Sequence, residues 1–145
     1  MMSTLNFSKI ILLLIVLCAC FCRKAENLTN LADGIIEGDI LPGEAAGYTG
    51  PIHVVASFTN DLEKITWSGS QHVVTNRNAY KIKELVAGKY YVIMYMDVNR
   101  NDRIDSGEPL GGYEADGDDR FDPVTLAGGE TLKVDIRFFG FYETE

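Results

Sequence analysis

The stretch "KYYVIMYMDVNRNDRIDSGEP", residues 89–109, contains two different patterns. After the initial lysine, residues 90–96 are aromatic or apolar on both faces of an extended chain. Such a run is typical of a strand that is covered on both sides, so we place it at the centre of a sheet. Residues 97–108 then carry a carboxylate or amide side chain at nearly every second position. The stretch therefore predicts a central strand that runs directly into a polar loop.

The polar loop fits a twelve-residue calcium-binding frame that begins at residue 97. In this frame, side-chain oxygens come from positions 1, 3, 5, 9 and 12, and position 7 contributes its backbone carbonyl. All of these are hard oxygen donors, and the segment has neither the His nor the Cys that zinc prefers. We therefore expect Ca²⁺ as the bound ion. The predicted side-chain ligands are Asp97, Asn99, Asn101, Asp105 and Glu108, with the Arg103 carbonyl as a further ligand.

Three features of the loop bear on what the ion does. Ile104 stands at position 8, where an apolar residue anchors the loop to a core. Asp102 stands at position 6, where glycine is usual, and Asp adopts the left-handed conformation at some cost. The flanking residues show no helical pattern, so we expect a structural calcium loop between strands rather than a helix–loop–helix sensor. The simpler alternative, a turn-rich Asp/Asn loop without an ion, accounts for neither Ile104 nor Glu108 in frame.

A second acidic segment, "YEADGDDRFD", follows at residues 113–122. Residues 97–122 together hold nine of the 21 acidic residues of the chain. The simpler interpretation of the second segment is a solvated acidic loop. The alternative is that Asp116 or Asp118 completes or duplicates the metal site.

Short alternating runs separated by Gly, Pro, Asn and Asp fill the chain from residue 34 onward. Period-2 alternation indicates strands with one buried face, and no stretch shows a sustained helical period. About seven strands at spacings of about ten residues predict an all-β fold, an antiparallel β-sandwich. The expected strands are 34–40, 51–58, 71–75, 79–85, 89–96, 121–126 and 131–138.

Three segments, "TGPIHVVASF" (49–58), "VAGKYYVIMYMDVNRNDRIDSGEPLGGY" (86–113) and "PVTLAGGETLKVDIRF" (123–138), carry a family resemblance. Together they resemble the carboxypeptidase-regulatory-like, transthyretin-type modules of exported bacterial proteins. In these modules a Gly-x-Tyr strand runs into a D-x-N-x-N-x-x-x-D-x-G-E-P-x-G loop. The resemblance implies a prealbumin-like, Ig-like sandwich with an accessory, non-catalytic role. The matching positions are Gly88, Tyr90, Asp97, Asn99, Asn101, Asp105, Gly107, Glu108, Pro109 and Gly111.

The N-terminal segment has a different composition. Lys9 precedes an apolar run over residues 10–19. A membrane-spanning helix needs about 20 apolar residues, so this run is too short to span a membrane, but it has the length of a signal-peptide core. "LCAC" (17–20) resembles a bacterial lipobox in which Cys20 is lipidated; Cys22 is a poorer candidate because Phe21 precedes it. We expect a lipoprotein signal peptide (1–19), a tether (20–33) and a folded domain (34–145). An ordinary secretory signal is the alternative. All three cysteines lie before residue 23, so the folded domain has no disulfide.

The net charge and the types of residue present limit the possible functions. A formal charge of −8 argues against a nucleic-acid partner. We expect a non-catalytic module, anchored by lipid in the bacterial envelope at the outer membrane or cell surface, with a binding or scaffolding role. A hydrolase using the 97–122 acids is an alternative, but the only histidines are His53 and His72, and we expect His53 to be a packed or surface residue of a strand. Recognition of a carbohydrate or protein partner by exposed aromatic residues is another alternative. Its candidates are Tyr48, Trp67, Tyr90, Tyr91, Tyr95 and Tyr113.

Overall fold

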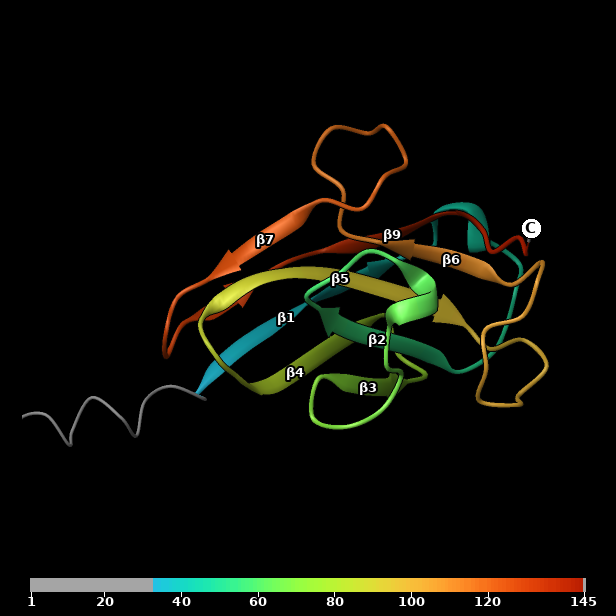
Figure 1. Ribbon diagram of the computed structural model, residues 1–145. Coiled ribbons are helices and arrows are strands. Elements are labelled where there is room, and N and C mark those ends of the chain that lie inside the picture. The colour runs from blue at the N-terminus through green and yellow to red at the C-terminus, as the bar shows by residue number, and fades with distance from the viewer. Residues whose placement is uncertain (1–32, 145) are drawn as a thin grey trace, which may run out of the picture.

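The computed structural model describes residues 33–144, which form a single curled β-sheet (Figure 1). The all-β prediction is confirmed, and among these residues no helix is long and apolar enough to cross a membrane. The proposed signal peptide (1–19) and all but the last residue of the proposed tether (20–33), including Cys20, lie outside the described residues. The nine strands are β1 (Gly34–Leu41), β2 (Ile52–Ser57), β3 (His72–Thr75), β4 (Ala79–Leu85), β5 (Gly88–Met96), β6 (Pro109–Gly112), β7 (Pro123–Leu126), β8 (Thr131–Lys133) and β9 (Ile136–Phe141), with short 3₁₀ turns η1 (Gly43–Ala45) and η2 (Leu62–Lys64).

The prediction of an antiparallel β-sandwich of about seven strands is confirmed only as an all-β fold, and it was wrong in two respects. The sheet has nine strands, and it is mixed because β1 pairs in parallel with β8 and β9. Alternation of apolar residues reports which face is buried but not the direction of the neighbouring strand, so the parallel pairs leave no pattern in the sequence. The unpredicted strand β6 reads Pro-Leu-Gly-Gly, a composition of low strand propensity, and it is held by its ladders with β5 and β9.

The predicted strand 131–138 is divided into β8 and β9 at Val134 and Asp135. Here the chain crosses closely over β1: a Cβ atom at Gly38 would lie 1.9 Å from the Val134 carbonyl oxygen. The Asp135 side chain accepts the Asp39 N–H at 2.9 Å, so a side chain replaces the backbone ladder at this point. The inward alternation was nevertheless right, since Val134, Ile136 and Phe138 are buried.

The sheet runs in the order β3-β2-β5-β6-β9-β1-β4, while β7 also pairs with β5 and β8 with β1. Its two end strands, β3 and β4, follow one another in the chain but do not pair. The sheet therefore curls into an open half-barrel (Figure 1).

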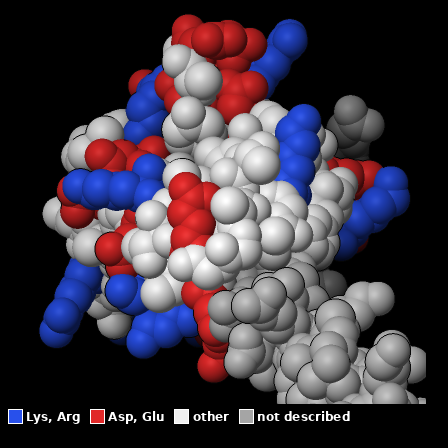
Figure 2. Space-filling model, turned by 90° about the vertical axis from the view of Figure 1, so that its left-hand side faces the viewer, with Lys and Arg blue, Asp and Glu red and all other residues white. Residues whose placement is uncertain are grey.

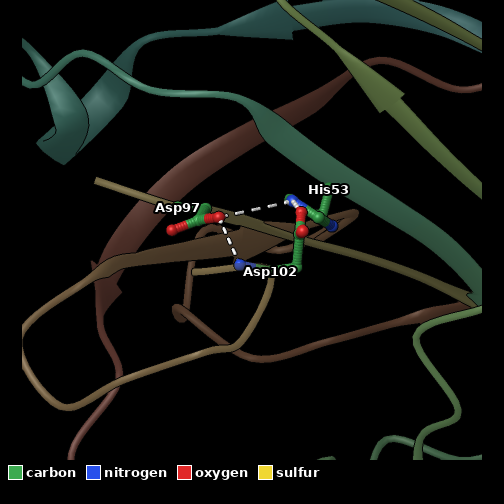
Figure 3. A group of neighbouring side chains, drawn as sticks. All are labelled: His53, Asp97 and Asp102. Atoms are coloured by element: carbon green, nitrogen blue, oxygen red, sulfur yellow. Dashed lines mark hydrogen bonds and ion pairs between the residues drawn. The ribbon is translucent and has the colours of Figure 1, made fainter. Parts of the chain in front are cut away.

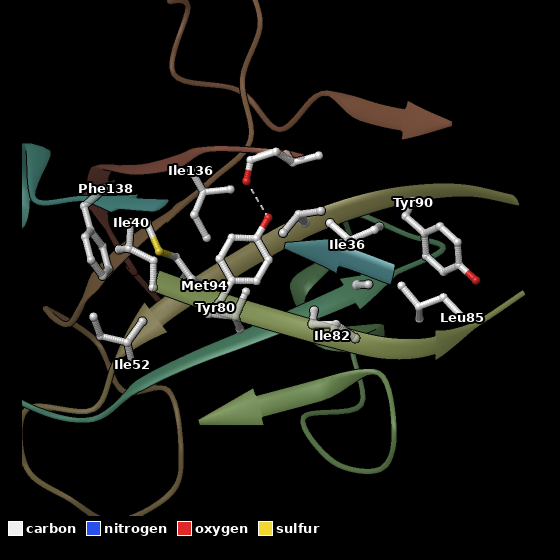
Figure 4. Close-up of a cluster of buried hydrophobic side chains, with 14 of the residues drawn as sticks. Ile36, Ile40, Ile52, Tyr80, Ile82, Leu85, Tyr90, Met94, Ile136 and Phe138 are labelled. Atoms are coloured by element: carbon white, nitrogen blue, oxygen red, sulfur yellow. Dashed lines mark hydrogen bonds between the residues drawn. The ribbon is translucent and has the colours of Figure 1, made fainter. Parts of the chain in front are cut away.

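Two clusters of buried side chains cover the two faces of this curl. The main cluster fills the inside, where Ile36, Tyr90, Met94 and Phe138 from three strands meet (Figure 4). The second cluster lies outside, where Val55, Ile93 and Tyr95 pack under the connection between β2 and β3. Strand β5 contributes to both clusters, which confirms the prediction of a strand covered on both faces.

Candidate metal site

Loop 97–108 connects β5 to β6 and so joins two antiparallel neighbours of the sheet. The predicted strand β5 precedes it, and the unpredicted strand β6 follows it. Asp97 continues the strand by donating its N–H to the Pro51 carbonyl at 2.9 Å. Ile104 is partly buried against the outer cluster, which confirms the anchoring role expected for position 8.

The Asp97 carboxylate is fully buried and organises the first turn of the loop. Its Oδ1 accepts the N–H of Asn101 at 3.1 Å, and its Oδ2 accepts the N–H of Asp102 at 2.8 Å. These bonds require the intervening chain to turn back sharply. Asp102 accordingly has φ +59°, the left-handed conformation that its position in the calcium frame demands.

The predicted ligands in the middle of the loop converge on one another. Nδ2 of Asn99 and Nδ2 of Asn101 both donate to Asp105 Oδ2, at 2.7 and 2.6 Å. These two hydrogen bonds, with Asn99 the stronger cause, lower the pKa of the Asp105 carboxyl. Arg103 lies beside this group and donates its N–H to Asn101 Oδ1 at 2.9 Å.

Glu108 closes the loop from its last position and is 5% exposed. Its Oε1 accepts the N–H of Val98 at 2.8 Å, and its Oε2 accepts the N–H of Asp105 at 3.0 Å. The one carboxylate thus connects the first and last parts of the loop. The side chains of Asn99, Asn101 and Asp105 contact one another, whereas the carboxylates of Asp97 and Glu108 accept backbone N–H groups of the same loop.

The buried carboxylates of this loop have few positive charges to balance them. Among residues 33–144, no Lys or Arg nitrogen lies within 4.0 Å of a carboxylate oxygen of Asp97, Asp102 or Glu108. The imidazole of His53 faces both Asp97 and Asp102, and its Nε2 lies 3.9 Å from each carboxylate (Figure 3). Burial lowers the pKa of His53 more than the three nearby carboxylates raise it, so the imidazole favours its neutral form.

His53 was not predicted as part of the site. It was expected to be a packed or surface residue of a strand, and it is packed on β2. In the ladder between β2 and β5, His53 stands opposite Tyr95, and Asp97 lies two residues further along the same face. A diagonal pair of this kind brings two side chains within reach. The alternation of "PIHVVASF" and "YVIMYMD" places both residues on the outer face, but the register that joins them is not visible in the sequence.

Asp116 and Asp118 lie elsewhere. Loop 113–122 leaves the opposite end of β6, a four-residue strand that spans about 13 Å, and both side chains are exposed. Glu114 and Asp119 of this loop bind Arg137, at 2.7 and 2.9 Å. Acidic side chains gather at the top of the molecule in Figure 2, where this loop rises in Figure 1, with basic side chains beside them. The structure therefore does not bring Asp116 and Asp118 to loop 97–108.

The aromatic candidates do not form one exposed face. Tyr90 and Tyr95 are fully buried, so they cannot belong to an exposed recognition surface. Trp67 is half-buried and stands edge-on to Tyr95, with ring centroids 4.8 Å apart and an angle of 86°. Tyr48 is 43% exposed and pairs with Phe141 rather than with Trp67.

No protein-family model, curated protein or solved structure matches this chain.

Proposed function

We propose that loop 97–108 is a structural calcium site in a non-catalytic β-module of the bacterial cell envelope. The observation that carries this proposal is the pair of buried carboxylates, Asp97 and Glu108, at the two ends of one loop without a Lys or Arg of the described residues beside them. Burying carboxylates is unfavourable unless their charge is balanced. A divalent cation supplies that charge. The proposed ligands are Asp97, Asn99, Asn101, Asp105 and Glu108, with the Arg103 carbonyl.

The donor set favours Ca²⁺ over smaller ions. The loop offers carboxylate, amide and carbonyl oxygens in a flexible arrangement, and Ca²⁺ takes six to eight such ligands. In the structure, the amide nitrogens of Asn99 and Asn101 face Asp105. Coordination requires each amide to present its oxygen instead, which is a rotation about one side-chain bond. Mg²⁺ demands a stricter octahedron and is the poorer fit.

The role of the ion follows from the position of the loop. Calcium would hold the connection between the central strand β5 and β6, in a domain whose residues 23–145 contain no cysteine. An ion bound only by the native state stabilises it by about 2.7 kcal/mol when its free concentration is a hundred times the dissociation constant. Because strands rather than helices flank the loop, this ion serves as a staple and not as a conformational switch.

The wider proposal includes the fold family and the anchor. The motif positions favour a prealbumin-like sandwich of the carboxypeptidase-regulatory type, and the "LCAC" segment favours lipidation of Cys20. A module held at the membrane in this way would bind or scaffold a protein or carbohydrate partner. Replacing Cys20 by Ala is expected to move the protein from the membrane fraction to the soluble exported fraction, and an unchanged distribution would contradict the lipid anchor.

Calorimetric titration with Ca²⁺ tests the metal assignment. The native protein should bind one Ca²⁺ with measurable heat, and Asn101→Ala should weaken binding at least tenfold, because it removes one amide ligand without removing a buried charge. Asn76→Ala, in the exposed turn between β3 and β4, is the matched control and should bind as the native protein does. Absence of binding by the native protein would contradict the proposal.

A further inference from the structure

His53 is buried without a hydrogen-bond partner for one of its ring nitrogens. The residue is 3% exposed, and its Nε2 has no hydrogen-bond partner among the described residues. This nitrogen points at Asp97 Oδ2 and Asp102 Oδ1, each 3.9 Å away (Figure 3). That separation is too long for a hydrogen bond and is slightly longer than the about 3.3–3.6 Å between two ligands of a tetrahedral ion with bonds of about 2.0–2.2 Å. The three ligand atoms all lie within 4.8 Å of one another.

The other ring nitrogen of His53 is held by a second histidine. Nδ1 of His53 lies 3.1 Å from Nε2 of His72, and the two rings stack with centroids 5.1 Å apart. If Nδ1 carries the proton and donates it to His72, the lone pair of Nε2 faces the two carboxylates. A histidine that binds a metal typically donates its other N–H to such a partner. Without a cation, that lone pair would face only negative charge.

The strand register builds this arrangement on a rigid support. His72 on β3 pairs with Val55 on β2, and His53 lies two residues before Val55 on the same face of β2. The stacking of His53 on Tyr95, with centroids 4.6 Å apart, fixes the ring from β5. Asp102 comes from the loop, and its side chain is 90% exposed, which leaves an entry path for an ion.

We propose that His53 Nε2, Asp97 Oδ2 and Asp102 Oδ1 form a second cation site, which takes a divalent ion of the first transition series such as Zn²⁺. Imidazole nitrogen with two carboxylates suits these ions, whereas Ca²⁺ takes oxygen ligands. Asp102, which has no side-chain role in the calcium frame, acquires one here.

This site shares one proposed ligand, Asp97, with the calcium site, and its other loop residue, Asp102, is not a proposed calcium ligand. Oδ2 of Asp97 faces His53, while Oδ1 of Asp97 accepts the N–H of Asn101 within the loop. His53 and Asp102 are absent from the proposed calcium ligands. Binding of a transition metal therefore does not require that the loop bind calcium.

Titration with Co²⁺ tests the proposal, because bound Co²⁺ absorbs visible light and quenches a nearby tryptophan. Trp67, the only tryptophan of the chain, lies edge-on to His72 with ring centroids 6.3 Å apart. The exported protein is used with its free cysteine thiols alkylated, so that thiolates do not bind the metal, and with Ca²⁺ in excess. We expect one Co²⁺ to bind, with quenching of Trp67, and one Zn²⁺ to displace it.

Two variants locate the ion. Asp102→Asn removes an exposed carboxylate and keeps a residue that adopts positive φ, so its fold is retained, and it should weaken Co²⁺ binding at least tenfold. His72→Phe should weaken Co²⁺ binding by about ten- to a hundredfold, because it removes the side chain that accepts the Nδ1 proton of His53. Both variants should bind Ca²⁺ as the native protein does. Asn101→Ala, in contrast, should weaken Ca²⁺ binding and leave Co²⁺ binding within twofold.

The same titrations would overturn the proposal in three ways. The first is that the native protein binds no Co²⁺. The second is that Asp102→Asn binds Co²⁺ with unchanged affinity. The third is that Asn101→Ala loses Co²⁺ binding together with Ca²⁺ binding. The last result would place the transition metal in the calcium loop. If the native protein binds Co²⁺ but not Ca²⁺, the proposed structural calcium site is contradicted and the second cation site is not.

Discussion

Glu108 accepts the backbone N–H of Val98 at 2.8 Å, so the last residue of the loop holds its second residue. Its other carboxylate oxygen accepts the Asp105 N–H at 3.0 Å. Glu108 therefore organises the loop through the backbone, in addition to its proposed role as a ligand.

Replacing Glu108 by Gln is expected to destabilise the protein even in the presence of a chelator. The amide has one oxygen, so either Val98 or Asp105 loses its acceptor, and an unsatisfied buried group costs about 1–3 kcal/mol. Urea unfolding with chelator present measures this loss. Glu63→Gln, on the exposed turn η2, is the control and should unfold as the native protein does. Equal stability of the two variants would mean that Glu108 acts only through a metal.

Substitutions of Asp102 test the left-handed backbone conformation of the loop. With φ +59° at this position, glycine relieves the contact of Cβ with the backbone, and we expect Asp102→Gly to be more stable than Asp102→Ala by about 1 kcal/mol. Both variants remove the carboxylate, so their difference isolates the conformational effect. Chemical unfolding in chelator provides the comparison. Equal stabilities would contradict the left-handed conformation at this residue.

The sequence predicted those contacts of the loop that join residues close together in the chain. The ligands from Asp97 to Glu108 lie within twelve residues, and their order follows a local frame that the chain itself dictates. His53 belongs to another strand, 44 residues before Asp97, and reaches the site only through the register of β2 with β5. Residue patterns do not encode such a register, so the second metal site was not predicted.

The fold shows the same limit. The runs that form β1, β4 and β5 were predicted to within two residues, because each has a strong apolar pattern. Strand β6, with two glycines and a proline in four residues, has no such pattern and exists because β5 and β9 pair with it. The break at Val134 arises from the close approach to Gly38, which is a tertiary contact.

Tyr80 connects β4 to this break and provides a test of the core. Its buried hydroxyl donates to the Val134 carbonyl at 2.7 Å. Tyr80→Phe leaves that carbonyl without this donor, and we expect a loss of about 1–3 kcal/mol in the free energy of unfolding. Tyr48→Phe, at an exposed ring, should change stability by less than about 0.5 kcal/mol. A loss no larger than that of the control would contradict the packing of Val134 against β4.

Arg137 gives the second acidic loop a dependence on pH. Its hydrogen bond to Glu114 lowers the pKa of that carboxyl from its ordinary 4.5. A carboxylate with a lowered pKa contributes stability above its ordinary pKa, and this contribution is lost as the pH falls through the lowered value. The native protein should therefore lose more stability than Arg137→Gln as the pH falls below about 4.5.

Melting temperatures measured at intervals between pH 7 and pH 3 give this comparison. Arg120→Gln is the control, because its contact with Asp118 is 3.9 Å long and exposed. Its curve should run parallel to that of the native protein, since the remaining carboxylates titrate alike in both. Parallel curves for the native protein and Arg137→Gln would show that the pair with Glu114 contributes nothing.

Thermal unfolding in chelator and in millimolar Ca²⁺ tests the calcium staple most directly. We expect a clear rise in the melting temperature of the native protein with Ca²⁺, because an ion held by the native loop stabilises the folded state alone. The rise should be much smaller in Asn101→Ala, whose loop lacks one amide ligand. A native protein that melts at the same temperature in chelator and in Ca²⁺ would contradict the account.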